Sequence, residues 1–163
     1  MPTNPDSRIY RWFIRPIVNQ LKQGTSPEKL SWSISLGMTL GVFPIMGSTT
    51  IVCLFIGHLF RLNQPILHLF KTFTYPIHLA LILVYIRLGQ MLNDAPLIRF
   101  SIPQLLNRFR EDPLKFAQDF GWAALHGIEA WAISALILIP LIRFITIHPL
   151  RKLFAKFGNP QPE

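Results

Sequence analysis

Three long apolar runs alternate with polar stretches along the chain. The first, residues 30–60, contains no Asp, Glu, Lys or Arg. The second, 62–86, is interrupted only by Lys71, and the third, 120–142, only by Glu129. A straight helix over residues 30–60 would be about 46 Å long, whereas the hydrocarbon core of a bilayer is about 30 Å thick. This pattern predicts an all-α integral membrane protein.

Helix-breaking residues interrupt the first two apolar runs. Gly41, Pro44 and Gly47 lie near the middle of the first run, and Pro76 lies in the second. Proline removes a backbone donor and clashes with the preceding helical turn, so we expect the first run to form two half-helices of about 20 Å each. The sequence therefore predicts that this run forms a re-entrant hairpin of broken helices. The alternative is a full span kinked at the proline.

Charge and composition point to a membrane surface as the partner. The chain is 50% hydrophobic and 15% charged, with 16 Lys and Arg against 8 Asp and Glu, a formal net charge of +8. The basic residues border the apolar runs and do not gather on a water-facing patch, so we expect contact with anionic lipids and not with nucleic acid. The single Cys53 cannot form an intramolecular disulfide.

Both ends of the chain are basic, while residues 87–119 are nearly neutral. The positive-inside rule therefore predicts that both termini are cytoplasmic, in a bacterial inner membrane crossed several times. The chain then divides into five parts: an interfacial basic helix (1–23), a module of broken membrane helices (24–92), an amphipathic surface segment cut by prolines (93–119), a transmembrane helix (120–142) and a basic amphipathic tail (143–163).

Several short motifs occur together in the membrane module. They are Ser26-Pro27, the small-residue run at 33–37, Gly41-Val42-Phe43-Pro44, and Arg61-Leu62-Asn63-Gln64-Pro65. In this order, over residues 24–92, the sequence resembles the bacterial membrane family DUF2062, which has no established biochemical function. Relatives are sometimes fused behind glycosyltransferases that act on lipid-linked sugars, so the resemblance implies envelope lipids and such enzymes as partners. Many members carry Asn-Pro where this chain has Tyr75-Pro76.

The residues after Pro44 would open the second half-helix of the hairpin. A helix start exposes backbone N–H groups and a partial positive charge, which together attract anions such as phosphate. We therefore name Gly47, Ser48, Thr49 and Thr50 as candidate lipid-headgroup ligands. Their alternative role is to cap the helix and to allow close helix packing.

Lys71 and Glu129 are the charged residues within the second and third apolar runs. A charge at the centre of a membrane helix costs about 2.5–3.5 kcal/mol, so each needs a partner or a wet cavity. Similar depths would let the two pair, with Lys71 also serving as counter-charge for a lipid headgroup. Alternatively, Lys71 extends toward the interface.

No cofactor or metal is expected. The spacing of His58, His68 and His78 does not align them on one helical face, and His126 with Glu129 would supply only two ligands.

Taken together, the broken helices and the charged residues favour a membrane protein that binds, and as a further step translocates, an anionic lipid or lipid-linked envelope precursor such as a polyprenyl phosphate. The alternative is a non-catalytic scaffold or accessory subunit of envelope enzymes. An enzyme acting on lipid phosphates would need a catalytic cluster that the sequence lacks.

Overall fold

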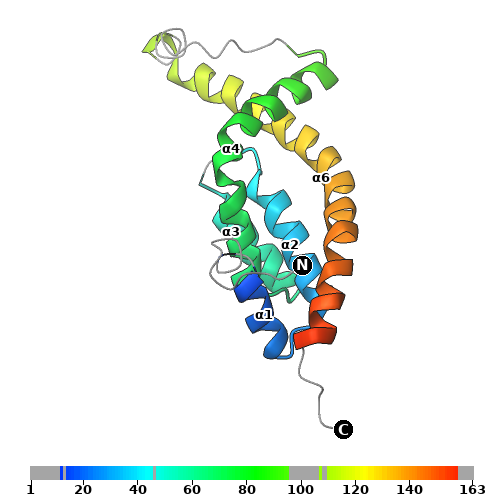
Figure 1. Cartoon of the computed structure of the whole chain (residues 1–163). Coiled ribbons are helices and arrows are strands. Elements are labelled where there is room, and N and C mark those ends of the chain that lie inside the picture. Colours follow the sequence, from blue (N-terminus) through cyan, green and yellow to red (C-terminus); the bar gives the residue numbers. More distant parts are fainter. Residues whose placement is uncertain (1–11, 13, 46, 96–106, 108–109, 158–163) are drawn as a thin grey trace.

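The computed structural model describes residues 12, 14–45, 47–95, 107 and 110–157. Within that part of the chain all regular structure is helical, which confirms the all-α class. The helices are α1 (Arg15–Lys22), α2 (Pro27–Gly41), α3 (Thr49–Leu59), α4 (Gln64–Leu92) and α6 (Pro113–Phe157) (Figure 1).

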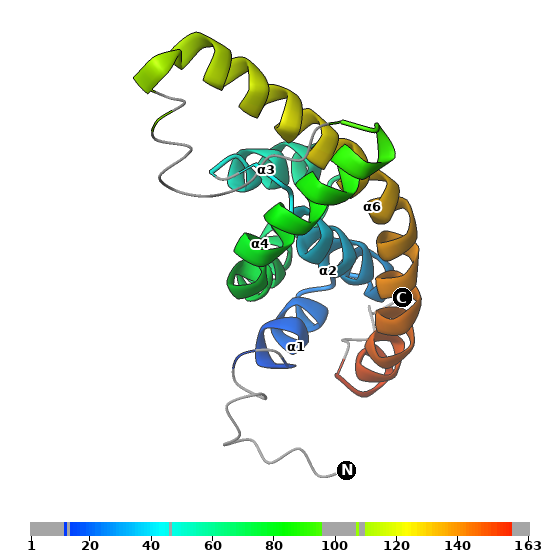
Figure 2. The same cartoon turned by 90° about the horizontal axis from the view of Figure 1, so that it is seen from above.

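Helix α2 is the central element, because it packs against α3, α4 and α6 (Figure 2). The helix begins where Ser26 accepts a hydrogen bond from the backbone of Lys29, and Pro27 occupies the first turn. Its buried surface is rich in small and polar residues: Ser31, Ser33, Ser35, Gly37, Thr39 and Gly41. A Cβ on Gly37 would lie 2.5 Å from the carbonyl oxygen of Leu67, so the missing side chain is what lets α4 approach.

Helices α2 and α3 form a hairpin around a break at residues 42–48. Pro44 is buried in this turn, and Gly47 has φ +82°, a conformation that glycine adopts without strain. After α3, the backbone N–H of Asn63 donates to Oγ of Ser33 at 2.9 Å. The chain therefore returns from the break to the first half of α2.

Pro76 does not end a helix. It lies inside α4, and the helix bends by 74° between its halves, Gln64–His78 and Ala80–Leu92. The bend falls at residue 79, three residues after Pro76, whereas a proline disturbs the turn that precedes it. The bend brings the end of α4 across α6 (Figure 1).

Helix α6 is a single helix of 45 residues that runs through three of the segments expected from the sequence. Pro113 opens it, after Asp112, whose Oδ1 accepts from the backbone N–H of Lys115 at 2.9 Å. Pro140 and Pro149 lie inside it. We expected segment boundaries at residues 119 and 142 because the charge of the sequence changes there. The helix continues through both, because charged side chains on an exposed face do not interrupt backbone hydrogen bonds. Residues 96–106 and 108–109 of the segment 93–119 lie outside the described residues.

Of the described helices, α6 is long and apolar enough to cross a membrane as it stands. Helix α4 counts as a second candidate only if its two bent halves form one span, and α3 is a shorter apolar helix.

One end of the molecule joins four elements. Ile17 and Leu21 of α1 pack with Leu30 of α2, Ile66 of α4 and Leu150 of α6 in a buried apolar cluster. Both the described N-terminal helix and the end of α6 therefore lie at this end, which we call the base. Of the expected interfacial helix 1–23, residues 1–11 and 13 lie outside the described part.

Candidate functional site

The break between α2 and α3 presents an uncapped helix start. Ser48 is the N-cap residue of α3, but its hydroxyl makes no cap hydrogen bond and donates instead to the carbonyl of Ile45 at 3.0 Å. Gly47 and Thr50 are exposed, while Thr49 is buried. Of the four expected headgroup ligands, the structure thus turns Thr49 inward and commits the hydroxyl of Ser48 to the turn.

Lys71 of α4 reaches the first turn of α3. Its Nζ donates to Oγ1 of Thr50 at 2.7 Å, and the side chain remains partly exposed. No described carboxylate lies within 4 Å of this ammonium group. Lys71 and the partial positive charge of the helix start therefore share one location without a balancing anion, an arrangement that an anionic group would stabilise.

The expected pair of Lys71 and Glu129 is wrong. Glu129 lies beside the far end of α4, where its Oε2 accepts from Nδ2 of Asn93 at 2.7 Å. Each charge has a polar partner of its own, and the two are separated by most of the length of the bent α4. The pair was expected because Lys71 and Glu129 would lie at similar depths in a flat bilayer. Similar depth alone does not bring side chains on different helices together.

The remaining helix breaker of the hairpin, Gly41, serves close packing. A Cβ there would collide with the side chain of Thr74 and lie 3.0 Å from the carbonyl oxygen of Lys71. Gly41 therefore sets the distance between α2 and the turn of α4 that carries Lys71.

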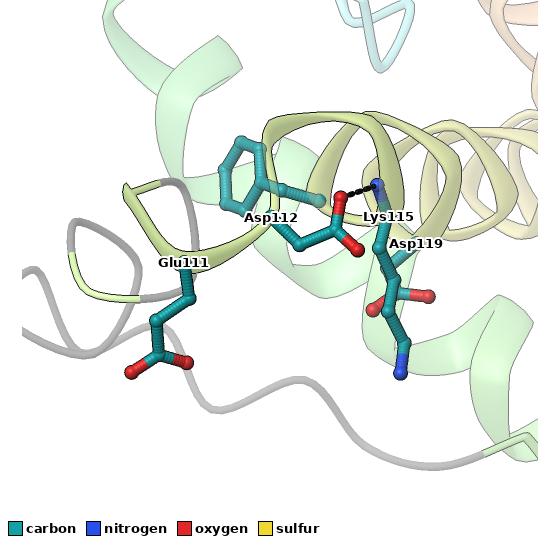
Figure 3. A pocket seen from close by; sticks show the side chains of 5 residues that line it. Glu111, Asp112, Lys115 and Asp119 are labelled. Atoms are coloured by element: carbon teal, nitrogen blue, oxygen red, sulfur yellow. Dashed lines mark hydrogen bonds between the residues drawn. The ribbon is translucent and has the colours of Figure 1, made fainter.

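A separate pocket lies at the start of α6 (Figure 3). It has a volume of about 340 Å³ and is lined by Glu111, Asp112, Lys115, Phe116 and Asp119. Asp112 caps the start of α6, because its Oδ1 accepts a hydrogen bond from the backbone N–H of Lys115. The side chain of Glu111 points away from that of Asp112 (Figure 3). Three carboxylates against one ammonium make this pocket unsuited to an anion.

The described residues contain no group of three or more His, Cys, Asp or Glu side chains that could hold a metal ion. His78 is buried at 3% exposure, and neither of its ring nitrogens has a hydrogen-bond partner there.

A family model described as "Uncharacterized protein conserved in bacteria (DUF2062)" matches residues 10–153. The chain belongs to the DUF2062 family. In this DUF2062 protein the match extends beyond the motifs at 24–92 and covers α6 as far as residue 153. Neither the curated proteins nor the solved structures that were compared gave a match.

Sequence reasoning missed two residues that shape this DUF2062 protein. Asn63 caps α4, ties it to Ser33 and donates from its side chain to Gln20 of α1. Asn93 follows the last residue of α4 and holds Glu129. An Asn just before Gln64-Pro65 is a recognisable helix start, but nothing local indicates which distant group each amide meets.

Proposed function

We propose that this DUF2062 protein is an integral protein of the bacterial inner membrane that binds an anionic lipid or lipid-linked envelope precursor at the break between α2 and α3. Translocation of that lipid by the broken helices is a further step of the proposal. The observation that carries it is the Lys71 ammonium beside the uncapped start of α3, without a described carboxylate.

The distribution of side chains supports a membrane setting. Polar residues of α2 are buried, whereas large apolar residues such as Ile51 and Phe55 of α3 are 70% and 66% exposed. In α6, only 11% of its most apolar 18-residue window is buried. An apolar solvent accounts for this inverted pattern, because scattered apolar residues are normal on a soluble surface but continuous apolar helix faces are not.

The lengths of the hairpin helices support re-entry. At 15 and 11 residues, α2 and α3 extend about 22 and 16 Å, less than a hydrocarbon core of about 30 Å. The contact between Asn63 and Ser33 brings the chain back toward the base. Helix α4 would then cross outward and α6 would cross back, with both termini cytoplasmic.

The ligand proposed for the break is a phosphate-bearing headgroup. Phosphate suits both the backbone N–H groups of Gly47 to Thr50 and the ammonium group of Lys71. The acyl or polyprenyl chain would lie along the exposed apolar face of α3. Lys71→Gln should therefore weaken binding of phosphatidylglycerol about tenfold or more, since hydrogen bonds to charged groups contribute about 1.5–3 kcal/mol.

Native mass spectrometry of the purified protein, titrated with phosphatidylglycerol or phosphatidylcholine, measures this loss. Lys29→Gln is the charge-matched control, because Lys29 is an exposed lysine in the first turn of α2, away from the break. Thr50→Val tests the second contact, with Thr72→Val as its control, since the Thr72 hydroxyl bonds its own helix at His68. Equal losses in Lys71→Gln and Lys29→Gln would refute the site.

The alternative is a non-catalytic scaffold for envelope glycosyltransferases. The close helix contacts at Gly37, Gly41 and Gly89 are compatible with it, because small residues at helix contacts serve packing and need no ligand. A folded Lys71→Gln protein that retains phosphatidylglycerol as tightly as the wild type would favour this reading.

A further inference from the structure

Arg143 of α6 stacks on Trp32 of α2 at the base of the molecule. Its Cζ lies 4.4 Å from the centroid of the indole ring. The backbone is fixed there by Ser31, whose hydroxyl donates to the carbonyl of Arg143 at 3.2 Å and lies 2.9 Å from Oγ1 of Thr146. The position of the guanidinium is therefore set by the contact between two helices.

Within the described part of the chain, no group accepts a hydrogen bond from this guanidinium. The indole lies against the guanidinium, whose in-plane N–H donors fit a carboxylate or phosphate bidentately. Nε of Arg143 is buried and has no partner among the described residues, and no described carboxylate lies within 4 Å of the guanidinium. Nearby, Arg151 is paired with Glu28 at 3.1 Å. Nε itself is closed to an outside ligand, whereas Arg143 as a whole is partly exposed, so its guanidinium can bind an anion from outside through its terminal N–H groups.

The surroundings favour an anion at a membrane interface. Trp32 is 38% exposed and Arg143 is partly exposed, so both are reachable from outside. Tryptophan is enriched at the headgroup level of bilayers. The adjoining helix ends add exposed positive charge at Lys22 and Lys152.

We propose that Arg143 and Trp32 form a phosphate-binding site that holds the headgroup of an anionic phospholipid at the base. The guanidinium binds the phosphate oxygens through its in-plane N–H groups, and the indole fixes its orientation. The same chemistry could hold a free phosphate ion, and the experiment separates the two sources.

This site is independent of the one at the break. Ser31, next to Trp32, and Gly41, against the Lys71 turn of α4, are ten residues apart on α2, which is about 15 Å along the helix. Lys71 of α4 would bind the anion at the break and Arg143 of α6 the anion at the base, so a substitution can abolish binding at one site and leave the other intact.

The test titrates the full-length protein in detergent with phosphatidylglycerol or phosphatidylcholine and counts bound lipids by native mass spectrometry. Arg143→Gln should lower the affinity for phosphatidylglycerol about tenfold or more. Arg151→Gln removes the same charge from the same end and should leave it unchanged within about twofold, because Arg151 already has a carboxylate partner. Equal losses in both variants, or no preference for phosphatidylglycerol over phosphatidylcholine in the wild type, would overturn the proposal.

Two further arms complete the test. Arg143→Lys keeps the charge but removes the planar fork, so an intermediate loss is expected and full retention would overturn the bidentate site. Inorganic phosphate that displaces phosphatidylglycerol at equal concentration would identify free phosphate as the ligand, whereas displacement only at large excess identifies the lipid. Lys71→Gln should keep the lipid that Arg143→Gln loses, which separates failure of this site from failure of the site at the break.

Discussion

Gly89 of α4 lies directly against the backbone carbonyl group of His126 in α6, so that no Cβ atom could fit between the two helices. A second close approach adjoins it, where a Cβ on Gly127 would lie 3.1 Å from the side chain of Ile86. The end of α4 after its bend is thus held to α6 by two glycines, one from each helix.

Gly89→Ala should therefore destabilise the protein. The added methyl group meets backbone and not a flexible side chain, so we expect a loss of about 1–3 kcal/mol and a lower melting temperature in detergent. Gly121→Ala is the matched control, because nothing lies within 4 Å of its Cβ position and alanine favours a helix by about 0.5–1 kcal/mol. A Gly89→Ala protein that melts like the wild type would contradict this helix contact.

Asn93 and Glu129 should be coupled, and Lys71 and Glu129 should not. The 2.7 Å hydrogen bond from Asn93 to Glu129 predicts a coupling of about 0.5–1.5 kcal/mol in the double-mutant cycle of Asn93→Ala and Glu129→Gln. Lys71→Gln combined with Glu129→Gln should be additive, since Lys71 bonds Thr50 instead. Melting temperatures of the single and double variants measure both cycles, and the opposite result would restore the Lys71 and Glu129 pair.

Gly47 should tolerate asparagine better than valine. With φ +82° and open space around its Cβ position, the cost of substitution is backbone strain and not a clash. Asparagine enters the left-handed region more easily than a β-branched residue, so Gly47→Val should lower stability by about 1–2 kcal/mol more than Gly47→Asn. Ser48→Ala should cost about 1 kcal/mol, since its hydroxyl makes one local hydrogen bond. Thermal unfolding of the three variants checks the order.

The proposed topology places residue 60 on the same side of the membrane as both termini. In a Cys53→Ser background, Phe60→Cys should react with an impermeant thiol reagent only from the cytoplasmic side, because Phe60 is 60% exposed at the end of α3. Asp94→Cys, after α4, should react only from the opposite side. Labelling of residue 60 from outside would show that residues 30–60 cross fully as a kinked helix.

Local signals in the sequence were enough to predict the helical class and the break after α2. Pro44 and Gly47 act on their own turns: proline removes a donor and glycine permits a positive φ, whatever surrounds them. The structure ends α2 at Gly41 and begins α3 at Thr49. The apolar runs likewise predicted helices, since their length and composition are properties of the chain alone.

The partners of the charged and polar side chains were decided only by the tertiary structure. Lys71 meets Thr50, Glu129 meets Asn93, and Arg143 stacks on Trp32, over separations of 21, 36 and 111 residues. These contacts depend on how α2, α3, α4 and α6 cross, and crossing is set by glycine contacts and by the bend in α4. Periodicity along one helix shows which face a residue occupies, but it carries no information on which residue of another helix comes to lie opposite.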